Sequence, residues 1–214
     1  MKLPAAVTAS VLLLSLAACT QRSDTVAHDL ATAPADAFMA AIAAHCGQAY
    51  AGKVVEDTPA PTGKGPFAGQ RLVMHVRGCA DPAHELRIPF HVGDDHSRTW
   101  VLTRTPNGLR LKHDHRHEDG SPDAITLYGG DSTPPGTAER QQFPADADSV
   151  AMFRRADMLA STHNTWAMEI DPDQTFVYEL TRPDGRRFRV QFDLSKPVDL
   201  PPPPWGDEAA QPAR

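Results

Sequence analysis

Three histidines alternate with charged residues at positions 113–117 and form the densest group of metal-ligating side chains in the 214-residue chain. His113, His115 and His117 are spaced by two residues, so on a strand their side chains share one face, with neighbouring Cα atoms about 7 Å apart. Imidazole suits Zn, Cu, Fe or Ni, and side chains of this length can converge on one ion. The spacing predicts a candidate site for Zn or Cu, to which Asp119 or Asp123 can add a ligand.

Two other interpretations of the same residues remain open. In the first, the histidines form a polar or pH-sensitive rim and are hydrogen-bonded to their neighbours. In the second, they belong to a cationic ligand pocket, because Arg98 and Arg104 fall on the same face and guanidinium groups bind carboxylates and phosphates. In this pocket Trp100 would form an apolar wall.

A β-hairpin is predicted to position these side chains. Asn107-Gly108 separates two alternating arms, residues 97–105 and 109–118, and Asn-Gly is typical of a two-residue type I′ turn. If these two residues form the loop, Trp100 faces His115 and Arg98 faces His117. The charged residues between the histidines then face water.

The histidine face is predicted to point inwards. Leu109 and Leu111 share it with the three histidines, so the histidines continue an apolar row at the point where a core gives way to a cavity. A second polar cluster, which includes His91 and His96, can join the same rim if residues 85–92 pair with residues 97–105.

The remaining chain predicts an all-β domain. Short segments with turn signals between them are expected to be strands, at residues 50–56, 71–79, 85–92, 124–128, 165–170, 175–181 and 187–194. Pro89 would place its strand at an edge or at a bulge. Residues 131–148 are expected to be a loop, with Gly129-Gly130 in a turn. A short helix that ends at Gly47 is expected within residues 34–49, and a second helix is expected at residues 149–160.

This pattern predicts an antiparallel up-and-down barrel, or a sandwich, preceded by a short helix. It is similar to the lipocalin and fatty-acid-binding class of barrels, although the Gly-x-Trp opening of lipocalins is missing. The stretch from Ser97 through the histidines resembles an uncharacterised family of proteobacterial secreted proteins, which implies no activity.

The N-terminus carries an export signal. An apolar segment too short to span a bilayer is followed by Leu16-Ala17-Ala18-Cys19, which resembles the lipobox of bacterial lipoproteins. The resemblance implies cleavage after residue 18 and lipidation of Cys19. Because position 20 is Thr rather than Asp, it also implies an outer-membrane anchor facing the periplasm.

The expected organisation is a signal peptide at residues 1–18 and a lipidated tether at 19–33. A single barrel at 34–196 and a disordered proline-rich tail at 197–214 follow. In the oxidising periplasm the two remaining cysteines, Cys46 and Cys79, are expected to form a disulfide, with free thiols as the alternative. The formal net charge of −6, without a basic stripe, argues against nucleic-acid binding.

Three functions remain open at this point. The first is a non-enzymatic lipoprotein that binds a small ligand or metal ion in its barrel. The second is a metal-assisted hydrolase at the histidines, with Asp119 or Asp123 as general base. The third is an assembly lipoprotein whose proline tail docks a partner. Motifs for an α/β-hydrolase nucleophile, a phosphate-binding loop and a helical zinc protease site are absent from the sequence.

Overall fold

The computed structural model describes residues 33–132 and 136–207. The predicted signal peptide, the lipobox and Cys19 therefore lie outside the described residues, as does the end of the predicted tail. None of the described helices is both long and apolar enough to cross a bilayer.

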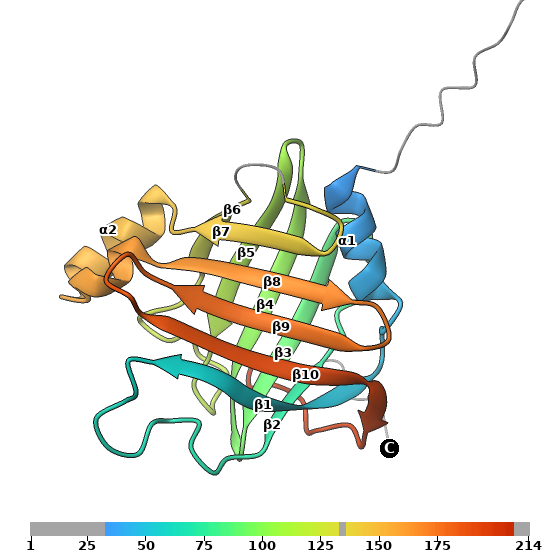
Figure 1. Ribbon diagram of the computed structural model, residues 1–214, viewed down its shortest axis with the longest axis horizontal. Coiled ribbons are helices and arrows are strands. Elements are labelled where there is room, and N and C mark those ends of the chain that lie inside the picture. The colour runs from blue at the N-terminus through green and yellow to red at the C-terminus, as the bar shows by residue number, and fades with distance from the viewer. Residues whose placement is uncertain (1–32, 133–135, 208–214) are drawn as a thin grey trace, which may run out of the picture. The chain divides into compact units, whose positions relative to one another are not determined.

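The strands of the described residues form one antiparallel sheet that curls into a nearly closed barrel (Figure 1). Their order is β6-β5-β4-β3-β2-β1-β10-β9-β8-β7, so neighbours along the chain are neighbours in space, and a β1–β10 ladder joins the two halves. The predicted all-β, up-and-down architecture is confirmed. The strands are β1 Ala49–Thr58, β2 Leu72–His75, β3 Glu85–Val92, β4 Asp95–Thr105, β5 Gly108–His115, β6 Tyr128–Asp131, β7 Arg140–Pro144, β8 Thr165–Asp171, β9 Thr175–Thr181 and β10 Arg187–Val198.

The barrel meets at a seam between β6 and β7, which are not joined by a ladder. The backbone N–H of Asp146 donates to the Gly129 carbonyl at 2.9 Å, and Ser149 Oγ accepts from the Gly129 N–H at 2.8 Å. A Cβ on Gly130 would lie 1.9 Å from the Pro144 carbonyl oxygen, so only glycine permits this approach. Gly129 and Gly130 pair with Lys112 and Leu111 of β5, so they are part of a strand and not the predicted turn. Strand β7 occupies part of the predicted loop.

The two α-helices cover opposite ends of the barrel (Figure 1). Helix α1, Pro34–Ala43, begins with proline at a position where the missing N–H costs nothing, and buries Phe38, Met39 and Ile42. It ends before the predicted Gly47. Helix α2, Ala147–Arg155, begins at Asp146, whose side chain accepts from the Ser149 N–H. It is followed by the short 3-10 helix η1, Leu159–His163.

Alternating residues of the strands fill the interior. On β10 the predicted face of Phe188, Val190 and Phe192 is buried. Strand β3 is internal, between β2 and β4, so the edge position expected as one alternative for Pro89 is wrong. The other alternative was a bulge, and the β3–β4 pairing is irregular one residue after Pro89, between Phe90 and Val92. The β2–β3 register pairs end at Phe90, next to the proline, so its missing N–H removes no bond from that ladder.

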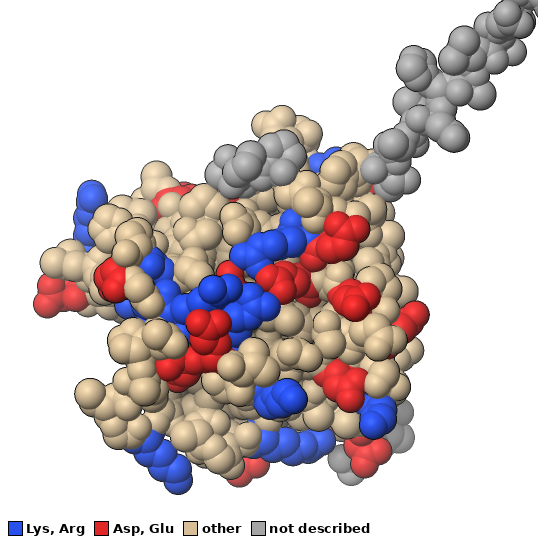
Figure 2. Space-filling view, viewed as in Figure 1, with Lys and Arg blue, Asp and Glu red and all other residues tan. Residues whose placement is uncertain are grey.

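The outer face of β8–β10 carries an ion-pair network around one buried carboxylate (Figure 2). Glu179 is only 2% exposed and contacts Arg140 at 2.7 Å, Arg187 at 2.9 Å and Arg189 at 2.5 Å. The two acidic residues Glu56 and Glu169 complete the network, so its formal charges balance.

Two further predictions concern the disulfide and the C-terminal segment. Cys46 and Cys79 form the predicted disulfide. The predicted disordered tail is wrong for residues 197–207, because β10 continues to Val198 and the following segment lies on the barrel. There the Trp205 N–H donates to the His96 carbonyl at 3.0 Å, and Asp207 lies 3.6 Å from Arg77.

Candidate functional site

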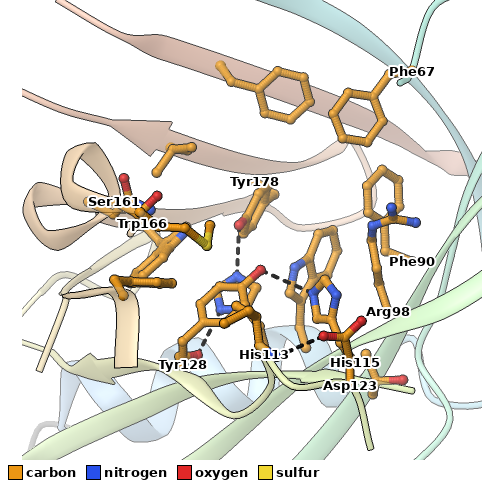
Figure 3. Close-up of a pocket in the computed structure, with 18 of the residues that line it drawn as sticks. Phe67, Phe90, Arg98, His113, His115, Asp123, Tyr128, Ser161, Trp166 and Tyr178 are labelled. Carbon is orange, nitrogen blue, oxygen red and sulfur yellow. Dashed lines mark hydrogen bonds between the residues drawn. The ribbon is translucent and has the colours of Figure 1, made fainter. Parts of the chain in front are cut away.

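An aromatic-walled cavity of about 360 Å³ opens at the α2 end of the barrel. Its wall comes from strands of both halves of the sheet, with Trp100 on β4, Tyr128 on β6, Trp166 on β8 and Tyr178 on β9. Figure 3 shows Tyr128, Trp166 and Tyr178 together with His113, His115 and Arg98. The scaffold of paired strands holds the wall, while η1 contributes Ser161 at the rim.

The β4–β5 hairpin directs its predicted face into the cavity, but its register differs from the predicted one by two residues. Thr105 pairs with Gly108, so the loop is Pro106–Asn107 rather than Asn107-Gly108. Proline has no N–H for the ladder and presets the backbone of a turn, which draws it into the loop. Because the shift is even, the same side chains still point inwards. Trp100 now lies opposite His113, and Arg98 lies opposite His115.

His113 is a buried part of the cavity wall, and both of its ring nitrogens are used. Nδ1 lies 3.1 Å from the Tyr128 carbonyl oxygen and Nε2 lies 2.7 Å from Tyr178 Oη. A carbonyl only accepts, so Nδ1 carries the proton and Nε2 accepts from the tyrosine hydroxyl. Burial lowers the pKa of His113 to about 3, which keeps the ring neutral.

The other two histidines of the predicted metal site lie in different surroundings. His115 lines the cavity with Nε2 3.1 Å from Tyr128 Oη, and its pKa is lowered by burial and then by the charge of Arg98. His117 follows the end of β5 and is exposed. Within residues 33–132 and 136–207, no three His, Cys, Asp or Glu side chains are placed to hold a metal ion. The predicted three-histidine metal site is therefore not assembled.

Two of the three predicted ligand-binding residues line the cavity, and the third does not. Trp100 is 2% exposed, stacks on Phe90 at 5.0 Å and on Tyr178 at 4.5 Å between ring centroids, and lines the cavity as predicted. Arg98 also lines it and donates to Asp95 at 2.6 Å. Arg104 does not line the cavity.

Arg104 instead joins the hairpin to α1. Its guanidinium contacts Asp36 at 2.5 Å and the Gly108 carbonyl at 2.8 Å. Arg104 lies six positions after Arg98 along β4, so the two side chains share a face of the strand but do not reach one site. Of the acidic candidates, Asp123 lines the cavity, whereas Asp119 is exposed and hydrogen-bonded to Ser121.

The second histidine cluster faces away from the cavity. His91 Nδ1 lies 2.6 Å from His96 Nδ1, and the His96 ring contacts Trp205 of the C-terminal segment edge-on. Neither histidine lines the cavity, so the predicted rim of five histidines is not formed. Ile88, Phe90 and Val92 alternate into the core, so His91 on β3 points to the other face. Between the pairs Phe90–Arg98 and Val92–Asp95, β4 has one residue more than β3, and this bulge interrupts the alternation that would keep His96 on the face of Arg98.

Two tyrosines of the wall were missed from the sequence. Burial raises the pKa of Tyr128 to about 12 and that of Tyr178 well above its ordinary value, so both hydroxyls stay neutral hydrogen-bonding groups. Alternation over residues 175–181 places Phe176, Tyr178 and Leu180 on one face, a signal that could have found Tyr178. Tyr128 had no comparable signal.

No protein-family model, curated protein or solved structure matches this chain. What the cavity can do therefore follows from its geometry. Its wall offers flat aromatic surfaces, and Arg98, His115 and Asp123 lie together on one side of it (Figure 3), which suits an amphipathic small molecule held in one orientation.

Proposed function

We propose that this protein is a non-enzymatic envelope lipoprotein that binds a small amphipathic ligand in the barrel cavity. The observation that carries the proposal is the aromatic-walled cavity, with Arg98, His115 and Asp123 on one side of it. Its volume of about 360 Å³ falls within the range of roughly 300–1,000 Å³ usual for small-molecule sites. The lipobox at residues 16–19 supports an anchor in the outer membrane, with the barrel in the periplasm.

The arrangement of side chains supports binding rather than turnover. His113, the most buried imidazole of the hairpin, uses both nitrogens to hold two tyrosines and so acts as part of the wall. Phe67, from the loop between β1 and β2, stacks on Phe188 at 4.8 Å and on Phe90 at 6.0 Å. It adds an apolar ring to the cavity wall, which favours the exclusion of water around a bound apolar group.

The first experiment tests the cavity with a fluorescent aromatic probe, anilinonaphthalene sulfonate. The protein used is the mature chain from residue 19 with Cys19→Ser, which lacks only the acyl anchor. Leu180→Trp places a large ring in the cavity, and Val55→Trp makes a similar change at a side chain that is 44% exposed on β1. We expect saturable binding that Leu180→Trp reduces at least tenfold and Val55→Trp leaves unchanged.

Two results would contradict the proposal. If Leu180→Trp binds the probe as tightly as the parent while circular dichroism shows it folded, the cavity is not the binding site.

The anchor is tested separately by labelled palmitate in the exporting cell: the full chain should incorporate label and Cys19→Ala should not. Equal labelling of both would remove the lipoprotein part of the proposal.

A further inference from the structure

Three side chains that line the cavity carry formal charges at neutral pH, namely Arg98, Asp123 and Arg186. The Arg186 guanidinium is already hydrogen-bonded to groups of the barrel. Its guanidinium donates to Asp57 at 2.5 Å and to the carbonyls of Thr58 and Arg187 at 3.1 and 3.2 Å. The two charges that remain are Arg98 and Asp123, and they have opposite signs.

Both of these side chains keep unused hydrogen-bonding capacity. Arg98 donates one N–H to Asp95 at 2.6 Å, and a guanidinium has five N–H groups. Asp123 accepts only the Ile125 N–H, at 2.7 Å on Oδ1, among the described residues. In the same part of the chain no Lys, Arg or His lies within ion-pair distance of the Asp123 carboxylate, so Arg98 and Asp123 do not neutralise each other.

The two charges flank one neutral imidazole. Arg98 is the β4 partner of His115, and on the other side the Asp123 N–H donates to the His115 carbonyl at 3.0 Å. Their backbones are thus separated by about two strand spacings, roughly 10 Å, and both side chains reach the cavity from that line (Figure 3). Because burial and Arg98 lower the pKa of His115, its ring adds no charge between them.

The rest of the cavity favours an aromatic or bulky apolar group. Trp100, Tyr128 and Tyr178 present rings next to this pair of charges, and aromatic pairs gain more than their buried area alone. The volume of about 360 Å³ lies near the lower end of the range for ligand sites, which suits one such group.

Resting on the proposed function, we infer that the ligand is a small zwitterion with an aromatic or bulky apolar body. Its ammonium binds Asp123, its carboxylate binds Arg98, and its apolar body lies against the rings. The aromatic α-amino acids are the simplest compounds with this chemistry. An anion alone would leave the Asp123 carboxylate without an ion-pair partner, and a cation alone would leave the remaining N–H groups of Arg98 unused beside its bond to Asp95, so either would bind less tightly than the zwitterion.

Four compounds with the same ring test each charge: phenylalanine, its methyl ester, N-acetylphenylalanine and N-acetylphenylalanine amide. Calorimetry on the Cys19→Ser chain should show phenylalanine binding most tightly. Loss of either charge should weaken binding about 10- to 100-fold, as expected for charge-assisted hydrogen bonds.

The variants assign the charges to residues. Arg98→Gln should weaken phenylalanine about 10- to 100-fold without changing the methyl ester, and Asp123→Asn should weaken phenylalanine without changing N-acetylphenylalanine. Arg110→Gln is the matched control, because Arg110 is exposed and pairs with Asp131 outside the cavity. It should leave all four compounds unchanged.

Failure of this inference is distinguishable from failure of the proposed function. If the neutral amide binds as tightly as phenylalanine, or if none of the four compounds binds, the zwitterion is excluded. The same holds if the methyl ester or the N-acetyl compound binds as tightly as phenylalanine. In each case the cavity still stands as a ligand site as long as Leu180→Trp abolishes binding of the fluorescent probe.

Discussion

His113 makes the stability of this barrel depend on pH, and the dependence can be isolated with one substitution. The ring is 3% exposed, and burial lowers its pKa from 6.5 to about 3. Between these values the unfolded chain holds a proton that the folded protein does not. Stability therefore falls as the pH is lowered below 6.5, and the loss is complete only near pH 3.

The magnitude follows from proton linkage. One proton of difference changes the free energy of unfolding by about 1.4 kcal/mol per pH unit. Between pH 7.5 and pH 5, protonation of this side chain in the unfolded chain alone lowers stability by about 2 kcal/mol. His75 and His91 act in the same direction, since burial lowers their pKa values to about 4 and about 3. The quantity to measure is therefore the difference between parent and variant.

The assay is urea unfolding of the parent and of His113→Gln at several pH values from 4.5 to 7.5. The variant loses its contact with Tyr178 and is less stable at every pH, but its stability should fall less steeply on acidification. The slope should be smaller by about 1.4 kcal/mol per pH unit between pH 4.5 and 6. Phe153→Leu is the control: it weakens the same core without removing a titrating group, so its curve should run parallel to that of the parent. If His113→Gln also runs parallel to the parent, His113 is not held neutral by burial and the reasoning fails.

Two other predictions concern the scaffold. Glu179→Gln leaves three arginines around a buried position without their central charge, and should lower the free energy of unfolding by about 3 kcal/mol in urea, whereas exposed Glu118→Gln should change it by less than about 0.5 kcal/mol. Equal effects would show that the network adds nothing. Replacing both Cys46 and Cys79 with Ser should cost about 4 kcal/mol, because the bond closes a loop with a sequence separation of 33, and should make the melting temperature insensitive to reductant. A parent protein that melts at the same temperature with and without reductant would refute this.

Much of the fold was predictable because it depends on local pattern. Alternation of apolar and polar residues identified most of the strands and the buried face of the hairpin, since side chains in a strand repeat with a period of two. The pairing of Cys46 with Cys79 followed from their number and from the expected compartment. An even error in the hairpin register left the inward face unchanged, so Leu109, Leu111 and His113 were placed correctly.

The seam and the histidine roles depended on contacts between distant segments. Gly129-Gly130 has the composition of a turn, and the pairing of these glycines with β5 shows that they belong to a strand. The close approach of the Pro144 backbone explains why the residue at position 130 is glycine. β7 was missed because its short sequence is paired on one side by β8 and adjoins the seam on the other.

The sequence by itself determined which side chains of the hairpin face inwards, because that depends only on alternation along one strand. The tertiary structure alone decided what those side chains meet. Tyr178, 65 residues away along the chain, takes the Nε2 lone pair of His113 that a metal ion would need. Arg98 and Arg104 share a face, yet Asp95 holds one at the cavity and Asp36 holds the other at α1. Local periodicity specifies a direction, whereas a site requires partners that only the closing of the barrel brings together.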